Sequence, residues 1–342
     1  MKRLAVYFTS PCRVSVREEH LPPPDAGQVL IKTLVSAISP GTELLIYRGQ
    51  APTDVPLDAS LSALAGPPGF PLKYGYSNVG RVTAAGAGIN PEWEGRHVFS
   101  FHPHESHFLK PLNEVFPVPA GLSCEEAALL PNMETAVNFL MDGRPLLGEQ
   151  VVVFGQGVVG LLTTALLSRT LPARLVTLDR YPLRRAKSLA LGAHASLDPE
   201  SPDAPARLDS LLHSEHSRGA DLVYELSGDP TALDAAVAVA GFGGRVVVGS
   251  WYGQKRVELN LGGRFHRDRI RLMSSQVSTL AAEWTGRWTK ARRLEVAWQM
   301  LRQVGPAQLI THRFPVERAA EAYALLDRHP EEAIQVLLTY ED

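Results

Sequence analysis

The stretch "VVVFGQGVVG" (151–160) constrains the fold of this chain more than any other part of the sequence. It continues the apolar run "QVVVF" (150–154), which is typical of a parallel strand covered on both faces. It leads into "VVGLLTTALLSRTL" (158–171), which is apolar nearly all round and predicts a buried helix. A G-x-G-x-x-G turn alone is weak evidence, but a turn of this kind between a strand and a helix is what a dinucleotide-binding site requires.

Strand-like and helix-like segments alternate after this turn. Parallel strands are predicted at 174–179, 221–226, 245–250 and 269–277, and helices at 182–193 and 230–240. This alternation predicts a doubly wound parallel sheet of the α/β class. We therefore assign residues 139–279 to a dinucleotide-binding domain.

The rest of the sequence predicts a second, mostly β domain. Clusters of glycine and proline separate its short β-like runs, which lie at 28–39, 78–89 and 96–101. Near the C-terminus, residues 310–340 predict a strand, an amphipathic helix and a strand that have no place in the parallel sheet. We expect this tail to return to the first domain, so that residues 1–138 and 280–342 form one unit. Two domains suit a chain of 342 residues, which is too long for one ordinary core.

Charge and cysteine content exclude several classes of protein. The formal net charge is −2, so there is no electrostatic case for binding nucleic acid or an anionic membrane. The two cysteines, Cys12 and Cys124, exclude a disulfide framework and a four-cysteine zinc lobe within one chain. The N-terminal apolar run breaks at Thr9, which is too early for a signal peptide, and no apolar stretch approaches membrane-spanning length. We expect a cytoplasmic enzyme that acts on a small molecule.

The glycines of the turn have distinct physical roles in a dinucleotide site. Gly155 permits the tight turn, Gly157 lets the backbone approach a pyrophosphate, and Gly160 lets the helix pack closely on the strand. The diphosphate would then lie on the helix N-terminus, where N–H groups and the helix dipole favour negative charge. We assign the whole turn to the cofactor site, and this assignment includes Gln156, Val158 and Val159. The alternative is a purely structural turn.

Asp179 ends the next strand, 24 residues beyond Gly155. A carboxylate there can accept both hydroxyls of the adenosine ribose and repels a 2′-phosphate, which favours NAD over NADP. Arg180, Arg184 and Arg185 lie close by and are the argument for NADP. We expect NAD and assign Asp179 and Arg180 to the cofactor site.

The ends of two later strands contribute further candidates. In this fold class, the carboxyl ends of the strands meet at the cofactor crevice. Ser227 follows the strand at 221–226, and Ser250 and Trp251 lie at the end of the strand at 245–250. We therefore expect these three side chains to contact the cofactor.

The chain resembles the medium-chain dehydrogenase/reductase superfamily over nearly its whole length. The motifs that carry the resemblance are "GTELLIYRG" (41–49), "GYSNVGRV" (75–82), "GRHVF" (95–99), "GEQVVVFGQGVVGLL" (148–162), "LALGA" (189–193), "GGRVVVGS" (243–250) and "ITHRFPVERAAEAYALL" (310–326). The segments "SAISPGTE" and "KYGYSNVGRV" are similar to the branch that contains bacteriochlorophyllide a dehydrogenase. The resemblance implies a GroES-like catalytic domain joined to a Rossmann domain, with hydride transfer in the cleft between them. It also implies a homodimer formed through the strand at 269–277.

The catalytic metal ligands of the zinc-dependent members are missing from this sequence. Those members use a cysteine, the histidine of a Gly-His-Glu, and a cysteine or glutamate before the Rossmann domain. The matching positions here are Pro40, Tyr76 and Pro131, none of which has the expected ligand atom. Because catalytic zinc needs about three protein ligands and one open position, we expect no metal.

One histidine-rich segment, "FHPHESHF" (101–108), is the alternative metal site. In an extended segment, His102 and His104 would face the same side, with Glu105 and His107 nearby. The alternatives without a metal are a solvated loop or a polar wall of the substrate pocket. We favour these over a metal, because the short spacings match no standard closed zinc site.

Without zinc, side chains must stabilise charge on a carbonyl oxygen and move a proton. The resemblance places Thr42, in the loop "ISPGTELLIYRG" (38–49), where a hydroxyl relays a proton, although this hydroxyl also suits a turn cap. The phenol of Tyr76 is a candidate donor to the substrate oxygen, or an aromatic ring packed under the cofactor. Glu134 lies beside the nicotinamide by family position and is a candidate acid or base, or a carboxylate at a helix start. Glu43, behind the loop, orients its neighbours or pairs with Arg48 or another base, and we favour a structural role.

These expectations combine into a zinc-independent, NAD(H)-linked oxidoreductase that interconverts a secondary alcohol and a ketone. One alternative is an NADPH-dependent enone or quinone reductase, against which Asp179 argues mildly. The other is a non-catalytic dinucleotide-binding sensor. The loss of the zinc ligands fits a sensor, but the presence of Thr42 and of the intact glycine turn does not require one. The sequence names neither the substrate nor the direction of hydride transfer.

Overall fold

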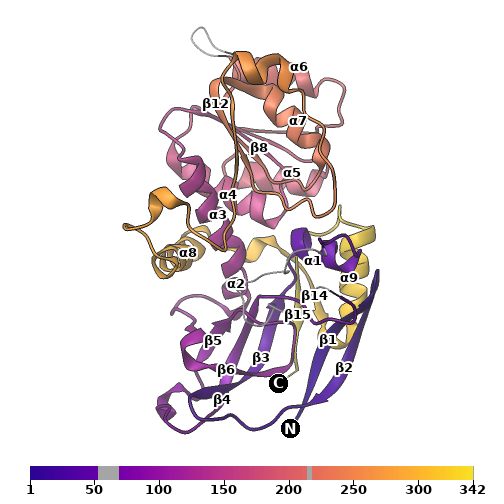
Figure 1. Ribbon diagram of the computed structural model, residues 1–342, viewed down its shortest axis with the longest axis vertical. Coiled ribbons are helices and arrows are strands. Elements are labelled where there is room, and N and C mark those ends of the chain that lie inside the picture. The colour runs from indigo at the N-terminus through magenta and orange to yellow at the C-terminus, as the bar shows by residue number, and fades with distance from the viewer. Residues whose placement is uncertain (53–68, 214–217, 342) are drawn as a thin grey trace. The chain divides into compact units, whose positions relative to one another are not determined.

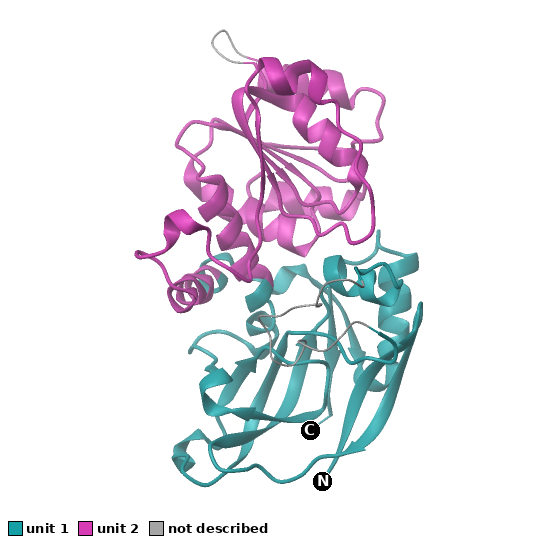
Figure 2. Cartoon of the chain, viewed as in Figure 1, with its two compact units in different colours: residues 1–131, 301–342 teal, residues 132–300 magenta. Residues whose placement is uncertain are grey.

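The computed structural model describes residues 1–52, 69–213 and 218–341. They form two compact units, shown in separate colours in Figure 2. Unit 1 consists of residues 1–131 and 301–342, and unit 2 consists of residues 132–300.

Both boundaries between the units fall within helices. Helix α3 (Leu130–Gly143) begins two residues before the first boundary, and α8 (Lys290–Val304) ends shortly after the second. The sequence places these boundaries at 138/139 and 279/280, where strand patterns begin and end. Most of α3 and α8 therefore belongs to the unit that carries the parallel sheet.

Unit 2 contains a six-stranded parallel sheet in the order β10-β9-β8-β11-β12-β13. Two of these strands, β8 and β12, are labelled in Figure 1. The strands are β8 (Gln150–Phe154), β9 (Arg174–Leu178), β10 (Ala195–Leu197), β11 (Ala220–Glu225), β12 (Ala240–Val248) and β13 (Arg271–Ser274). The order reverses between β8 and β11, so the chain winds outward in both directions from this point. The connecting helices are α4 (Val158–Leu167), α5 (Pro182–Ala190), α6 (Ala204–Leu212) and α7 (Pro230–Val239). This is the predicted doubly wound α/β fold.

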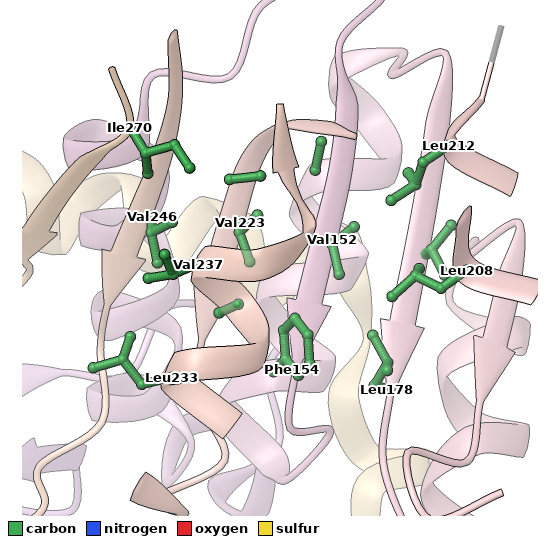
Figure 3. Packing of buried hydrophobic residues seen from close by; sticks show 14 of the residues in the cluster. Val152, Phe154, Leu178, Leu208, Leu212, Val223, Leu233, Val237, Val246 and Ile270 are labelled. Atoms are coloured by element: carbon green, nitrogen blue, oxygen red, sulfur yellow. The ribbon is translucent and has the colours of Figure 1, made fainter. Parts of the chain in front are cut away.

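The apolar run of β8 is explained by burial on both faces of the sheet. Val152 and Phe154 belong to one cluster of buried side chains, which continues through Val223 and Val246 (Figure 3). Val151 and Val153 belong to a separate cluster on alternate positions of the same strand. Because successive side chains of a strand point to opposite faces, a strand covered by helices on both sides must be apolar throughout.

Strand β13 is shorter than the sequence predicts. It covers Arg271–Ser274 instead of residues 269–277. Arg269 has a φ of 54°, in the left-handed region, which no β-strand residue adopts. This backbone turn delays the start of the strand.

Unit 1 is mostly β-structure. Its seven-stranded sheet has the order β14-β15-β3-β4-β5-β7, and β6 also pairs with β3. The strands are β3 (Gln28–Ala37), β4 (Asn78–Ala85), β5 (His97–Ser100), β6 (His107–Pro111), β7 (Phe116–Pro117), β14 (Ile310–Pro315) and β15 (Gln335–Thr339). A separate hairpin consists of β1 (Lys2–Ser10) and β2 (Arg13–His20). The C-terminal segment thus enters this sheet through β15, which pairs with β3, and α9 (Ala319–Arg328) lies between β14 and β15 in the chain.

The stretch at 38–49 was expected to be a loop, and that expectation is wrong. Most of it forms helix α1 (Pro40–Tyr47). Pro40 takes the first helical position, where its fixed φ suits the helix and its missing N–H has no intrahelical partner to lose. The Arg48 guanidinium lies 2.6 Å from the Asp327 carboxylate of α9 and ties the end of α1 to that helix.

Candidate active site

The glycine-rich turn in unit 2 has the geometry that a bound diphosphate needs. Gly155 has a φ of +87°, and a Cβ there would lie 2.5 Å from Ser227 Cα. A Cβ on Gly160 would lie 2.0 Å from the Gly155 carbonyl oxygen, so helix and strand touch at this point. A Cβ on Gly157 would meet no described atom within 4 Å. Two glycines are thus required by protein packing, whereas Gly157 keeps open space at the helix start.

The first turn of α4 is suited to an anion. Gly157 is its N-cap residue, and within the described chain no side chain accepts a hydrogen bond from this helix end. The N–H groups of Val158 and Val159 therefore keep the polarity that binds phosphate at helix N-termini. The buried side chain of Gln156 serves the turn from inside, because it donates to the Gly155 carbonyl oxygen and accepts from Thr164 Oγ1.

Asp179 holds the turn as well as ending β9. One carboxylate oxygen accepts the N–H of Gln156 at 2.7 Å, and the other accepts the N–H of Tyr181 at 2.9 Å. Each oxygen retains a second lone pair, so the carboxylate can still accept from a ribose hydroxyl. The nearby Arg180 is already paired, at 3.1 Å, with Asp229.

The other two arginines beside Asp179 also have protein partners. The Arg184 guanidinium lies 4.7 Å from the centre of the Tyr181 ring. The Arg185 guanidinium contacts Asp198 at 3.0 Å and donates to the Asp179 carbonyl oxygen. The Asp198 carboxylate partly offsets the charge of Arg185, whereas the aromatic contact leaves Arg184 charged.

A buried carboxylate that the sequence analysis missed organises the ends of β11 and β12. Glu225 accepts hydrogen bonds from the N–H and hydroxyl of Ser227 and from the hydroxyl of Tyr252. Burial and the charge of Glu225 raise the pKa of Tyr252, so this phenol stays protonated. Ser250 Oγ accepts the N–H of Gly228 at 2.8 Å, and Trp251 beside it is half-buried. Ser227 and Ser250 are therefore held in place by neighbouring loops.

Unit 1 brings together two of the three predicted catalytic residues. The Tyr76 hydroxyl donates to Ser39 Oγ at 2.5 Å and lies 3.4 Å from Thr42 Oγ1. Thr42 and Tyr76 are half-buried, and Ser39 is 8% exposed. We call Ser39, Thr42 and Tyr76 the hydroxyl cluster. Ser39 was missed, although a serine directly before Pro40 is a typical helix N-cap.

Glu43 lies behind the hydroxyl cluster, as expected, but its partners were not foreseen. One of its oxygens accepts the N–H of Ser39 at 2.7 Å. The other contacts His104 Nε2 at 3.0 Å and accepts the hydroxyl of Tyr323. Arg48, the base that the sequence suggested for Glu43, pairs with Asp327 instead.

The three histidines of the histidine-rich segment contact three different groups. His104 contacts Glu43, whereas His102 Nε2 contacts Glu105 at 2.9 Å and His107 Nδ1 contacts the Ser106 hydroxyl at 3.1 Å. Burial raises the pKa of Glu105, but the hydrogen bond and charge of His102, and then of Lys73, outweigh it and lower this pKa to about 2.

Among the residues that the structure describes, one group has three ligand atoms close enough together for a metal ion. It consists of His329, Glu331 and Glu332 on the surface, and all three are exposed. Exposed acidic clusters of this kind are common without a metal.

Glu134 is engaged in a buried ion pair. Its carboxylate lies 2.9 Å from Nη2 of Arg293, a side chain that is 1% exposed. Arg293 also donates to Asn138 Oδ1 at 2.5 Å and to the Thr279 carbonyl oxygen at 3.2 Å. Burial raises the pKa of Glu134, and the charge of Arg293 opposes this effect. The predicted acid or base therefore neutralises a buried guanidinium.

Comparisons with known proteins agree with the fold and the turn. A family described as zinc-binding dehydrogenase matches residues 158–293. D-guloside 3-dehydrogenase of Escherichia coli K12 is 23% identical over 334 residues, which cover 92% of this chain and 93% of that protein.

No helix in the described part of this chain is long and apolar enough to cross a membrane.

Two solved structures share the fold along nearly the whole chain. One is described as a short chain alcohol dehydrogenase of Escherichia coli CFT073 complexed with NADH; it is 19% identical, covers 99% of both chains and has a TM-score of 0.79. The other is a Sinorhizobium meliloti 1021 protein bound to NADP, at 19% identity, 99% coverage of both chains and a TM-score of 0.76. With the glycine turn and the doubly wound sheet, these similarities support the resemblance to the medium-chain dehydrogenase/reductase superfamily of NAD(P)-dependent oxidoreductases.

Proposed function

We propose that this protein is a zinc-independent, NAD(H)-linked oxidoreductase that interconverts a secondary alcohol and a ketone. The observation that carries the proposal is the hydroxyl cluster of Ser39, Thr42 and Tyr76. Tyr76 occupies a position where zinc-dependent members have a metal ligand, and its hydroxyl is hydrogen-bonded to two other hydroxyls. Protein hydroxyls thus take the place of the metal as polarising groups.

When bound, the nicotinamide cofactor would supply a hydride to the carbonyl carbon of the ketone, or accept one from the carbinol carbon of the alcohol. The backbone of Gly157, Val158 and Val159 would hold the diphosphate, because it combines open space with the N–H groups of a helix start. Asp179 would accept the ribose hydroxyls through its remaining lone pairs. The pairing of Arg180 with Asp229 supports NAD over NADP, since it partly neutralises the cation that follows Asp179 in the sequence.

The hydroxyl cluster would handle the proton. When a ketone is reduced, negative charge develops on the carbonyl oxygen. Tyr76 has one O–H, so it stabilises this charge by redirecting that hydrogen bond from Ser39 to the carbonyl oxygen. Tyr76 then transfers its proton to that oxygen, and a proton from solvent restores the phenol through Ser39 or Thr42. Such a chain is feasible because each hydroxyl both donates and accepts. We leave Glu134 out of this path, because it is paired with Arg293.

We also propose that the protein is a cytoplasmic homodimer joined through β13. This strand is the outer member of the parallel sheet, and Arg271, Leu272 and Ser274 are exposed. An unpaired edge strand is a template for pairing with a second copy. Light scattering of the purified protein tests this, and a monomer at micromolar concentration would rule it out.

Steady-state kinetics with NADH and a panel of ketones test the catalytic proposal. Tyr76→Phe and Thr42→Val should each lower kcat by about tenfold to a thousandfold, the usual contribution of a group that moves a proton. Tyr47→Phe is the matched control, because this buried tyrosine lies on α1 outside the cluster. Wild-type kcat in both cluster variants would remove the hydroxyls from the mechanism. Stoichiometric zinc in elemental analysis would overturn the metal-free assignment.

A further inference from the structure

A chain of buried polar side chains lies directly behind the hydroxyl cluster. His104 Nε2 contacts Glu43 at 3.0 Å, and both side chains are 0% exposed. On its other side, His104 Nδ1 contacts Ser36 Oγ at 2.7 Å, and Ser36 Oγ contacts the Tyr340 hydroxyl at 2.9 Å. Burying so many polar groups is costly unless every one of them is hydrogen-bonded.

This chain has the composition of a Ser-His-acid triad but not its geometry. In a hydrolytic triad, Nε2 faces the serine and Nδ1 faces the acid, whereas the two nitrogens are exchanged here. Ser36 is 0% exposed and its hydroxyl is also bonded to Tyr340, so no substrate can reach it. Nucleophilic catalysis by Ser36 is therefore excluded, and another role is needed.

Three hydrogen-bonding groups satisfy the carboxylate of Glu43, which is 0% exposed. The Ser39 N–H, the Tyr323 hydroxyl and His104 Nε2 all converge on its two oxygens. These three hydrogen bonds offset the cost of burying the carboxylate. If Nε2 of His104 carries a proton, it donates to Glu43, and Nδ1 then accepts from the Ser36 hydroxyl.

His104 is linked to both partners of the hydrogen bond between Tyr76 and Ser39, because it packs on Gly75 and contacts Glu43. A Cβ on Gly75 would lie 2.6 Å from His104 Nε2, so the residue preceding Tyr76 packs directly on the imidazole. Through Glu43, the same imidazole is linked to the backbone N–H of Ser39. The buried pair of Glu43 and His104 thus sets the positions of both Ser39 and Tyr76.

We propose that Glu43 and His104 are positioning residues that hold the Ser39 and Tyr76 hydroxyls in register for proton transfer. Neither touches the reacting atoms: Glu43 fixes the start of α1, and His104 fixes Glu43 and supports the backbone at Gly75. The inference rests on the proposed role of Tyr76. It adds that the activity of Tyr76 depends on the buried pair of Glu43 and His104 behind the hydroxyl cluster.

A double-mutant cycle between Glu43→Gln and Tyr76→Phe tests this inference. Glu43→Gln should lower kcat by about tenfold to a hundredfold, the range that small misplacements of catalytic groups produce, while KM for NADH stays within about twofold. In the Tyr76→Phe background, the same change should cost less than about threefold, because the group being positioned is already gone. An equal loss in both backgrounds would overturn the positioning role. A wild-type kcat for Tyr76→Phe alone would instead refute the proposed function.

A second measurement does not depend on activity or on a variant that folds. Nitrogen-15 NMR of His104 in the wild-type protein should show a proton on Nε2, since this nitrogen must donate to Glu43. An imidazole protonated on Nδ1 alone would overturn the inference. Tyr47→Phe serves as the control for kinetics and for thermal unfolding, because it changes a tyrosine on α1 that lies outside the buried chain.

Discussion

Alanine substitutions at Gly157 and Gly155 should separate the binding role of the glycine turn from its structural role. Gly157→Ala places a methyl group where no described atom lies within 4 Å. The protein can accommodate it, at a cost of about 0.5–1 kcal/mol for an alanine at a helix N-cap. The methyl group would, however, occupy the space of the diphosphate and cost at least one hydrogen bond to a charged group, about 1.5–3 kcal/mol. We therefore expect the Kd for NADH to rise about tenfold to a hundredfold.

Gly155→Ala should instead lower the stability of the protein even without bound NADH. Its φ of +87° is unfavourable for alanine, and the new Cβ would lie 2.5 Å from Ser227 Cα. The left-handed conformation costs about 1–2 kcal/mol and overpacking a further 1–3 kcal/mol. For a domain of this size, that sum corresponds to a fall in Tm of roughly 4–20 °C without any ligand.

Fluorescence titration with NADH and thermal unfolding of the ligand-free protein measure the two effects. Gly262→Ala is the matched control, because its Cβ would also meet nothing within 4 Å but lies outside the turn. A Gly157→Ala variant that binds NADH as tightly as Gly262→Ala would refute the reasoning. So would a Gly155→Ala variant with unchanged Tm, since the close contact with Ser227 would then not constrain the turn.

Two further predictions concern buried charges. Glu134→Gln leaves the buried Arg293 without its counter-ion and should destabilise the protein by about 3 kcal/mol in urea unfolding; a loss of kcat as large as that of Tyr76→Phe, with normal stability, would restore Glu134 as an acid or base. Glu105 has its pKa lowered from 4.5 to about 2, so its charge stabilises the fold above pH 4.5, and this contribution is lost as the pH falls towards 2. Glu105→Gln should therefore show a smaller fall in Tm between pH 6 and pH 3 (roughly, the range over which this contribution begins to be lost) than the wild type, and parallel curves would contradict the assignment.

The loop prediction for residues 38–49 shows where local patterns mislead. Proline and glycine in succession are typical of a turn, and Pro40-Gly41 was interpreted in that way. In the fold, the same proline begins α1, because the first helical position tolerates it and Glu43 satisfies the N–H of Ser39. The capping group is a side chain whose partners come from elsewhere in unit 1, and a local pattern does not contain that information.

The three candidate catalytic residues illustrate the same limit. Thr42 and Tyr76 were chosen separately by position, and the structure places their oxygens 3.4 Å apart although they are 34 residues apart in sequence. Glu134 was chosen by the same kind of reasoning, yet its carboxylate pairs with Arg293, 159 residues away. The position of a residue within a family predicts roughly where it lies in the fold. The tertiary packing decides which partner its charged side chain contacts.

The sequence alone determined the features that depend on short-range periodicity and on glycine. The apolar strand at 150–154, the turn of Gly155, Gly157 and Gly160, and the strand–helix alternation follow from which side chains fit a two-sided parallel sheet. The tertiary structure decided which polar groups meet. Glu43 contacts His104 across 61 residues and Tyr323 across 280, and no local pattern encodes contacts that exist only after strands and helices have packed.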